Sequence, residues 1–192
     1  MPTYPIMSAL NFELERFATP IGQMLLVSDE QQQVRAVDWQ DYEARMLLLM
    51  RRQYKGIAVS LRDAAQPSPA RRILEAYFAG DLSGVDRIQV AFGGTDFQRQ
   101  VWLGLRGIPA GQVLSYGDFA QRLGRPSASR AVGLANGANP ISIVLPCHRV
   151  IGSNATLTGY GGGLQRKRWL LEHETALAAF SPDPQSATLP GF

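Results

Sequence analysis

The sequence has one cysteine, Cys147, and only two histidines, His148 and His173, among its 192 residues. A single cysteine cannot form a disulfide within the chain, and three such side chains cannot provide the four ligands of a Cys/His zinc site. No spacing of aspartate and glutamate suggests a metal site of another kind. We therefore expect no metal ion and no small-molecule cofactor.

Long apolar runs are also absent. The run Met46–Met50 is far too short to cross a bilayer, which takes about 20 apolar residues. The first residues do not combine a basic segment with a long apolar stretch, as a secretory signal would. We expect no membrane association and, by default, a cytoplasmic location in which thiols stay reduced.

The net charge of +3 is small, but the charges are unevenly distributed along the chain. Residues 1–92 hold ten Lys/Arg against eleven Asp/Glu, whereas residues 93–175 hold nine against four. A basic second half favours contact with a polyanion. An ordinary solvated surface explains the charge alone equally well.

The first half predicts a small sheet with helices. Three short β-type runs, separated by turn signals, indicate an antiparallel meander: Phe12–Phe17, Met24–Val27 and Val34–Trp39. Asp41 is expected to cap a helix that reaches about Tyr54. A further strand is expected at Ile57–Leu61, and a helix at Arg71–Ala79 that Gly80 stops. Nothing before residue 92 suggests chemistry, so we assign residues 1–92 to a scaffold domain.

Gly93-Gly94 marks the expected boundary, and helical signals dominate residues 93–175 after it. Thr95–Gln98 has the capping-box pattern, and Ser115–Asp118 is expected to cap a second helix that ends at Leu123–Pro126. A third helix is expected from about Ser127 to Gly137, which gives a helix-turn-helix candidate. Such corners also occur in many small helical domains.

Small residues on the third helix, Gly133, Ala135 and Gly137, leave two interpretations open. They allow either close approach to a partner surface or tight packing between helices. A last helix is expected from about Leu164 to Glu174. Residues 176–192, with three prolines, are expected to form a poorly ordered tail.

The surroundings of Cys147 are unusual for a lone cysteine, which is more often a small buried hydrophobe. It follows Pro146 at the end of an apolar run, where a new turn or helix start favours the thiolate. His148 adds a base and Arg149 a fixed positive charge. Adjacent residues of a helical turn do not face one another, so a bridging water is the easier proton relay.

A base of this kind needs a carboxylate that holds its tautomer and stabilises its cation. Glu172 and Glu174, both on the last helix, are the nearest carboxylates in the sequence. Spacing alone does not choose between them.

The motifs around Cys147 resemble those of the O6-alkylguanine-DNA alkyltransferases. They are Asn139-Pro140, Pro146-Cys147-His148-Arg149-Val150, Gly159-Tyr160, Gly162-Gly163-Leu164 and Lys167 followed by Glu174, with Ser115-Tyr116-Gly117 and Arg130-Ala131-Val132-Gly133 upstream. The resemblance is close over about residues 95–174 and loose before them, and it is nearest to the bacterial constitutive type. It implies an α+β fold with an N-terminal ribonuclease H-like sheet-and-helix domain and a mostly helical C-terminal domain with a helix-turn-helix.

The resemblance also implies a single-turnover repair reaction. Cys147 would accept the alkyl group from O6-alkylguanine as a thioether, with His148 as the water-linked base and Glu174, rather than Glu172, as its partner. Tyr116 would protonate N3 of the leaving guanine. Asn139 would tie the active-site turn to the helix-turn-helix, and Lys167 would support the site loop.

DNA contacts are implied in the same way, with double-stranded alkylated DNA as the partner, bound through its minor groove. Arg130 would fill the stack that the flipped base leaves, and the third helix would touch the groove through Ala135, Asn136 and Gly137. The base pocket would be lined by Tyr160 and Gly161 and by the carbonyls of Cys147 and Val150. Clustering of several copies on DNA is a further possibility.

Gly161 stands where several relatives carry serine. We hypothesise that the pocket is therefore roomier and accepts O4-alkylthymine and longer alkyl groups. Two alternatives remain for the chain as a whole. A Cys/His hydrolase would leave the basic half unexplained, and a non-enzymatic lesion-binding or regulatory DNA protein would not need the Cys-His-Glu set.

Overall fold

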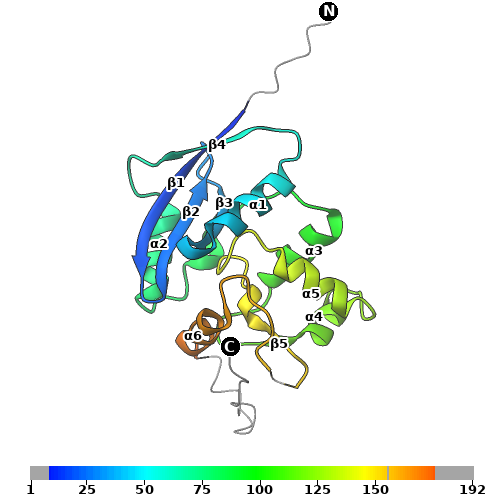
Figure 1. The fold of residues 1–192 in the computed structure, drawn as a ribbon. Helices are drawn as coiled ribbons and strands as arrows, with labels where there is room; N and C mark the ends of the chain where they lie inside the picture. Colours follow the sequence, from blue (N-terminus) through cyan, green and yellow to red (C-terminus); the bar gives the residue numbers. More distant parts are fainter. Residues whose placement is uncertain (1–8, 155, 176–192) are drawn as a thin grey trace, which may run out of the picture. The chain divides into compact units, whose positions relative to one another are not determined.

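The computed structural model describes residues 9–154 and 156–175 (Figure 1). The tail predicted at residues 176–192 lies outside them. The chain forms two compact units, one that runs up to Thr95 and includes Pro140–Val144, and one made of Asp96–Asn139 and the chain from Leu145 onward. The expected mixture of α and β structure is confirmed. No helix in the described ranges is long and apolar enough to cross a membrane.

The first unit contains a four-stranded sheet with the order β3-β2-β1-β4. The strands β1 (Leu10–Thr19), β2 (Gly22–Ser28) and β3 (Val34–Trp39) pair antiparallel, which confirms the predicted meander. The strand β4 (Val59–Asp63) pairs parallel to β1, so the sheet is mixed rather than wholly antiparallel. The reason is that a helical crossover separates β3 from β4 and returns the chain to the far edge of the sheet.

That crossover starts differently from the prediction. A 3-10 turn, η1 (Gln40–Tyr42), precedes α1 (Glu43–Gln53), and neither has a side-chain cap. The prediction that Asp41 caps this helix is wrong, because Asp41 lies inside the 3-10 turn and the α-helix begins two residues later.

The second helix of this unit, α2 (Pro69–Phe78), begins and ends as its sequence indicates. Ser68 Oγ accepts a hydrogen bond from the Arg71 N–H at 3.2 Å. Gly80 has a φ of 107°, and Asp81 N–H donates to the Ala76 carbonyl at 3.0 Å. This pattern is the Schellman ending, which favours glycine because of its left-handed backbone. A short 3-10 turn, η2 (Val85–Arg87), follows.

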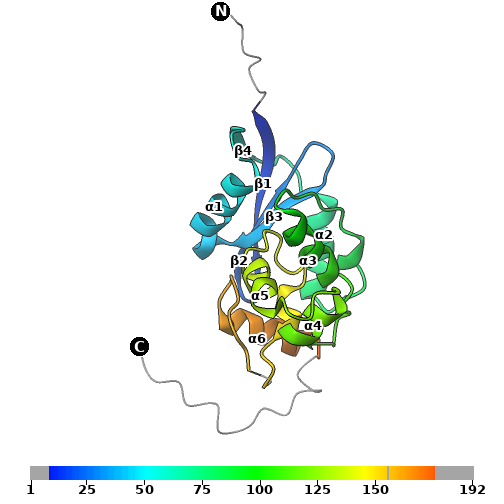
Figure 2. The ribbon, with the colours of Figure 1, turned by 90° about the vertical axis from the view of Figure 1, so that its right-hand side faces the viewer.

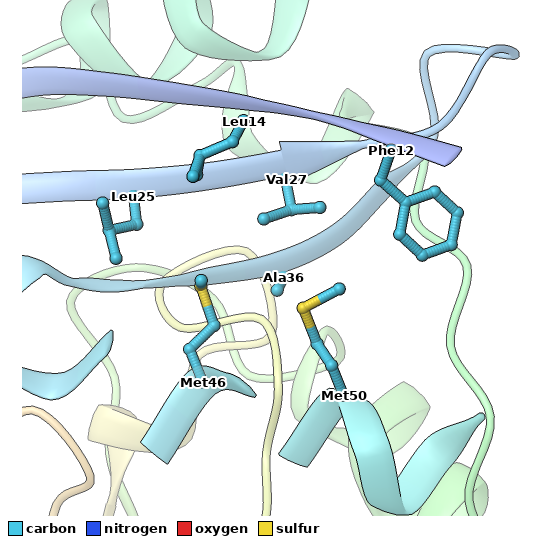
Figure 3. Close-up of a cluster of buried hydrophobic side chains, with 7 residues drawn as sticks. All are labelled: Phe12, Leu14, Leu25, Val27, Ala36, Met46 and Met50. Atoms are coloured by element: carbon cyan, nitrogen blue, oxygen red, sulfur yellow. The ribbon is translucent and has the colours of Figure 1, made fainter. Parts of the chain in front are cut away.

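Buried apolar side chains of the strands lie on both faces of the sheet. One face packs on Met46 and Met50 of α1 through Phe12, Leu14, Leu25, Val27 and Ala36 (Figure 3). On the other face, the rings of Trp39 and Phe78 of α2 lie 6.4 Å apart between centroids. Figure 2 shows α1 and α2 on opposite sides of the strands.

The apolar segment Pro140–Val144 is part of this unit, although the chain on both sides of it belongs to the second unit. Val37 N–H donates to the Pro140 carbonyl, and Ser142 N–H donates to the Val37 carbonyl, each at 3.0 Å. Ile143 is fully buried with a φ of 70°, which is rare for a β-branched residue. The run is therefore a tight turn held against β3, and not an independent strand.

The second unit is mostly helical. Its elements are α3 (Asp96–Leu105), β5 (Leu114–Ser115), α4 (Tyr116–Arg122), α5 (Ser129–Gly137), η3 (Cys147–Arg149), β6 (Val150–Ile151) and α6 (Leu164–His173). The helices α3 and α5 are joined where the Trp102 Nε1–H donates to the Ala135 carbonyl at 2.8 Å. The strands β5 and β6 form a short parallel pair.

The predicted helix-turn-helix is formed by α4 and α5. Ser115 Oγ caps α4 by accepting the Asp118 N–H at 3.0 Å. Gly124 follows the C-cap of α4 with a φ of 71°, and Arg125 N–H donates to the Ala120 carbonyl at 2.9 Å. The second helix, α5, begins at Ser129, two residues later than expected.

Candidate active site

Cys147 opens the three-residue turn η3 and is 5% exposed. Pro146 before it has φ −77° and ψ 66°, and Cys147 N–H donates to the Leu145 carbonyl at 2.7 Å. These values describe an inverse γ-turn. Asn139 Nδ2 donates to the same Leu145 carbonyl at 2.7 Å. Asn139, which directly follows α5 and its C-cap, therefore ties the end of the helix-turn-helix to the turn that presents the thiol.

Of the two expected forms, a new turn or a helix start, the structure has a short 3-10 turn at Cys147. A 3-10 turn of three residues aligns too few peptide dipoles to favour a thiolate, and the Cys147 N–H is already bonded to Leu145. A positive group comes instead from α6. Lys167 is fully buried, and its ammonium interacts electrostatically with Cys147.

Lys167 also ties together the segment that follows η3. Its Nζ donates to the Val150 carbonyl at 2.7 Å and to the Thr158 carbonyl at 2.8 Å. Burial lowers the pKa of Lys167 to about 8, although the nearby Cys147 acts in the opposite direction. The ammonium form therefore predominates at neutral pH and holds the two ends of this loop together.

His148 and Glu174 meet in the interior of the unit. The His148 Nε2 lies 2.9 Å from Glu174 Oε1, and both side chains are almost completely buried. Glu174 follows the last turn of α6, whereas the side chain of Glu172 is exposed. Of the two carboxylates that spacing left open, the structure brings Glu174 to the histidine.

The charge states of this pair determine the tautomer of the ring. Burial alone would raise the pKa of the Glu174 carboxyl, but the His148 ring and the Arg149 guanidinium outweigh it and hold that pKa well below its usual range. Burial lowers the pKa of His148 against the opposing effect of Glu174. His148 is therefore neutral at pH 7, and because Glu174 can only accept, Nε2 carries the hydrogen.

The other ring nitrogen, His148 Nδ1, is then the basic one. It is buried and has no hydrogen-bond partner among residues 9–154 and 156–175. A neutral imidazole whose hydrogen is held by a carboxylate, with its second nitrogen available, is arranged to accept a proton.

Arg149 is the residue whose place the sequence did not predict. Its guanidinium forms a two-pronged ion pair with Glu174, with Nε 2.8 Å from Oε2 and Nη2 2.8 Å from Oε1. Its Nη1 donates to the Ile108 carbonyl at 2.5 Å. The sequence indicated only a positive charge next to the thiol, because the partner carboxylate lies 25 positions along the chain.

Asn136 and Ala135, which were expected to contact DNA, face inward instead. Each is 4% exposed. Asn136 Nδ2 donates to the Tyr116 hydroxyl at 3.4 Å and to the Cys147 carbonyl at 3.3 Å. The two residues follow the inner face of α5 because the helix period turns positions 132, 135 and 136 toward α3 and the active-site turn.

The outer face of α5 is formed by other residues. Arg130 and Gly137 are exposed, and Leu134 between them is 74% exposed. In the loop after β6, Tyr160 lies edge-on to the His148 ring, with 6.5 Å between ring centroids, and Gly161 follows it half-buried. The Val150 carbonyl accepts a hydrogen bond from the Lys167 ammonium.

Known proteins match both units of this chain. Residues 96–176 match the family described as 6-O-methylguanine DNA methyltransferase, DNA binding domain, and residues 15–92 match its ribonuclease-like domain. The methylated-DNA--protein-cysteine methyltransferase of Salmonella typhimurium is 54% identical over 160 residues, which cover 83% of this chain and 94% of that protein. The protein of the same name from Mycobacterium bovis is 57% identical over 105 residues, which cover 55% of this chain and 63% of that protein.

Among solved structures, Mycobacterium tuberculosis OGT in complex with DNA matches with a TM-score of 0.68 at 38% identity, covering 87% of this chain and 94% of that one. The resemblance inferred from the motifs around Cys147 and the ribonuclease-like character of the first unit are both confirmed. The chain therefore belongs to the 6-O-methylguanine DNA methyltransferase family of DNA-binding repair enzymes.

Proposed function

We propose that this protein repairs O6-alkylguanine in double-stranded DNA by transferring the alkyl group irreversibly to the sulfur of Cys147. The main support is the buried set of His148, Glu174 and Lys167 around the sole cysteine of the chain. The names of the curated relatives specify a protein cysteine as acceptor, and this chain has only one to offer. A Cys/His hydrolase could use the same buried set, but the matching families and relatives are DNA methyltransferases. A non-catalytic DNA protein would need neither the cysteine nor its partners.

In the proposed reaction, His148 Nδ1 takes the thiol proton through a bridging water. The thiolate then attacks the O6-alkyl carbon in line, the bond from carbon to O6 breaks, and its electron pair stays on the base. Tyr116 gives a proton to N3 of the departing guanine. A thioether is a poor leaving group and the chain has no second thiol to remove it, so each molecule acts once.

The alkylated atom lies inside the duplex, so the nucleotide must first be flipped out. Flipping costs a few kcal/mol, and less for a damaged, weakly paired base. Arg130, exposed on α5, would enter the gap, and the exposed Gly137 would let that helix approach the minor groove closely. The flipped base would lie between Tyr160, Gly161 and the carbonyls of Cys147 and Val150.

Double-stranded DNA as the partner is supported by the complex of the Mycobacterium tuberculosis relative with DNA. A cytoplasmic location is proposed because a reactive acceptor thiol persists where thiols stay reduced. Clustering of several copies on DNA stays a prediction.

The test is to incubate the protein with a duplex that contains O6-methylguanine and to measure the masses of the protein's peptides by mass spectrometry. We expect one added methyl group on the peptide that contains Cys147, at a limit of one per chain, and none in Cys147→Ala. Label on another peptide, no label, or continued turnover would each rule out the proposal.

Arg130→Ala should separate base flipping from the chemistry. Without the arginine the gap in the duplex stays empty, so we expect repair of the duplex to slow by about tenfold or more, the cost of roughly one lost stacking contact. Reaction with free O6-benzylguanine needs no flipping and should be nearly unchanged. Single-turnover rates on both substrates provide the measurement, and equal losses on the two would refute the stacking role.

The size of the base pocket is tested at Gly161. If the absence of a side chain there makes room for O4-alkylthymine and longer alkyl groups, butyl lesions should react at a rate close to that of methyl lesions. Gly161→Ser should then slow the butyl lesion more than the methyl lesion. A collapse of the wild-type rate with alkyl size would contradict the hypothesis.

A further inference from the structure

Asn136 lies between two groups that face the substrate in the proposed reaction. We infer that it is a positioning residue that keeps the Tyr116 hydroxyl directed as a proton donor toward the flipped base. The inference rests on the proposed function and assigns to Asn136 a part in the chemistry rather than in DNA contact.

The orientation of the Asn136 amide follows from its neighbours. Its Nδ2 lies 3.3 Å from the Cys147 carbonyl and 3.4 Å from the Tyr116 hydroxyl oxygen. A backbone carbonyl can only accept a hydrogen bond, so the amide nitrogen, and not the amide oxygen, must face Cys147. The same nitrogen then necessarily donates to Tyr116.

This direction decides what the tyrosine can do. Because the Tyr116 oxygen accepts a hydrogen bond from Asn136, the hydroxyl hydrogen is not used in that bond and can be donated to the base. An aspartate at the same position would accept the tyrosine hydrogen and reverse the arrangement. The second contact keeps the phenol in register with the carbonyl of Cys147, so that the proton donor and the attacking sulfur are fixed relative to each other.

The other end of the amide fits this interpretation. Asn136 is 4% exposed, and its Oδ1 is buried without a hydrogen-bond partner in the part of the chain that the structure describes. An unsatisfied buried acceptor costs about 1–3 kcal/mol. A leucine would fill the same space without that cost, so packing alone does not account for an amide here.

The proton balance of the step needs no further reactant. Cys147 loses one proton to His148 through the water, and the bond from sulfur to the alkyl carbon forms as the bond from that carbon to O6 breaks. Tyr116 delivers one proton to N3, so the base leaves as neutral guanine. The phenolate is then reprotonated by the protonated His148 by way of water, which restores both groups.

The experiment compares two lesions in the same duplex, O6-methylguanine and O6-methyl-3-deazaguanine, in which carbon replaces N3. The quantity measured is the ratio of the two single-turnover rates of labelling at Cys147. Partial loss of folded protein affects both rates equally and leaves this ratio unchanged. The variants are Asn136→Leu, Asn136→Asp and Tyr116→Phe, with Asn136→Leu also made in the Tyr116→Phe background.

We expect the wild type to favour O6-methylguanine by about 10²-fold, the lower end of the range for a general acid, and every single variant to bring the ratio close to one. Adding Asn136→Leu to Tyr116→Phe should change the ratio no further. A wild-type ratio near one, a wild-type ratio retained in Asn136→Asp, or a further fall in the double variant would overturn the inference. Failure of the wild type to label Cys147 on either lesion would instead overturn the proposed function.

Discussion

Replacing His148 with glutamine is expected to slow alkyl transfer at pH 7 by about 10²- to 10⁴-fold, the usual contribution of a general base. The glutamine amide can still donate to Glu174 Oε1, as His148 Nε2 does at 2.9 Å, so the carboxylate keeps its partner. What is lost is the basic nitrogen, Nδ1. The measurement is the single-turnover rate of methyl transfer from saturating duplex.

The pH dependence gives this prediction a second and sharper form. Burial lowers the pKa of His148 below its usual 6.5, so the base is free above that value and the wild-type rate should be flat through pH 7 and fall only in acid. In His148→Gln no neighbouring base takes the thiol proton, so formation of the thiolate depends on the hydroxide of the solvent. The rate of the variant should therefore keep rising with pH above neutrality, where the wild-type rate is flat.

His173 provides a matched control. It is the other histidine of the chain, and its ring stacks on Trp169 at 4.6 Å between centroids, within α6. His173→Gln should leave both the rate and its pH profile unchanged. A wild-type rate in His148→Gln at pH 7, or a profile that does not change shape, would remove His148 from the reaction.

The parts of the fold that sequence predicted correctly depend on local chemistry. Ser115 accepts an N–H that the first turn of α4 leaves unpaired. Gly80 and Gly124 adopt the positive φ that ends a helix, which glycine tolerates best. Alternating apolar residues likewise mark the strands. In each case the local structure depends on residues only a few positions away, so the sequence pattern is enough to predict it.

The features that sequence missed depend on distant partners. The parallel pairing of β4 depends on the edge of the sheet to which the crossover returns. Asp41 does not cap the helix because it lies inside a 3-10 turn. The helix period places Asn136 on the inner face of α5, but its hydrogen-bond partners, Tyr116 and the Cys147 carbonyl, lie on other segments. The sequence indicates Arg149 as a positive charge beside the thiol, whereas its guanidinium pairs with Glu174, which follows α6.

The motif itself identified the family, yet it did not determine how its charges are paired. Cys147, His148 and Arg149 are adjacent in sequence, yet their partners come from distant positions. His148 and Arg149 both bind Glu174, and Lys167 of α6 interacts with Cys147. The motif therefore identifies the reacting residue, and the residues that support it become visible only once α6 is folded against it.

Replacing Arg149 with methionine is expected to destabilise the protein by about 3–5 kcal/mol at pH 7, the cost of leaving one charge of a buried pair uncompensated. Glu174 is 1% exposed, and Arg149 supplies two of its hydrogen bonds at 2.8 Å. Chemical denaturation followed by near-ultraviolet circular dichroism measures the loss. Arg149→Met combined with Glu174→Gln should lose less than the sum of the two single variants, because the unpaired charge is gone.

The effect of pH on Arg149→Met follows from the sign of the Glu174 shift. The pKa of the carboxyl is held well below its usual range in the folded protein, so its stabilising contribution is complete above the unfolded value of about 4.3 and is lost as the pH falls below it. The difference in stability between wild type and Arg149→Met should therefore be full at pH 7 and shrink toward pH 3. The control is Arg168→Met, which replaces an exposed arginine of α6. It should change stability by no more than about 0.5 kcal/mol at either pH. A difference that stays constant down to pH 3 would mean that Arg149 acts through packing, and not through the charge of Glu174.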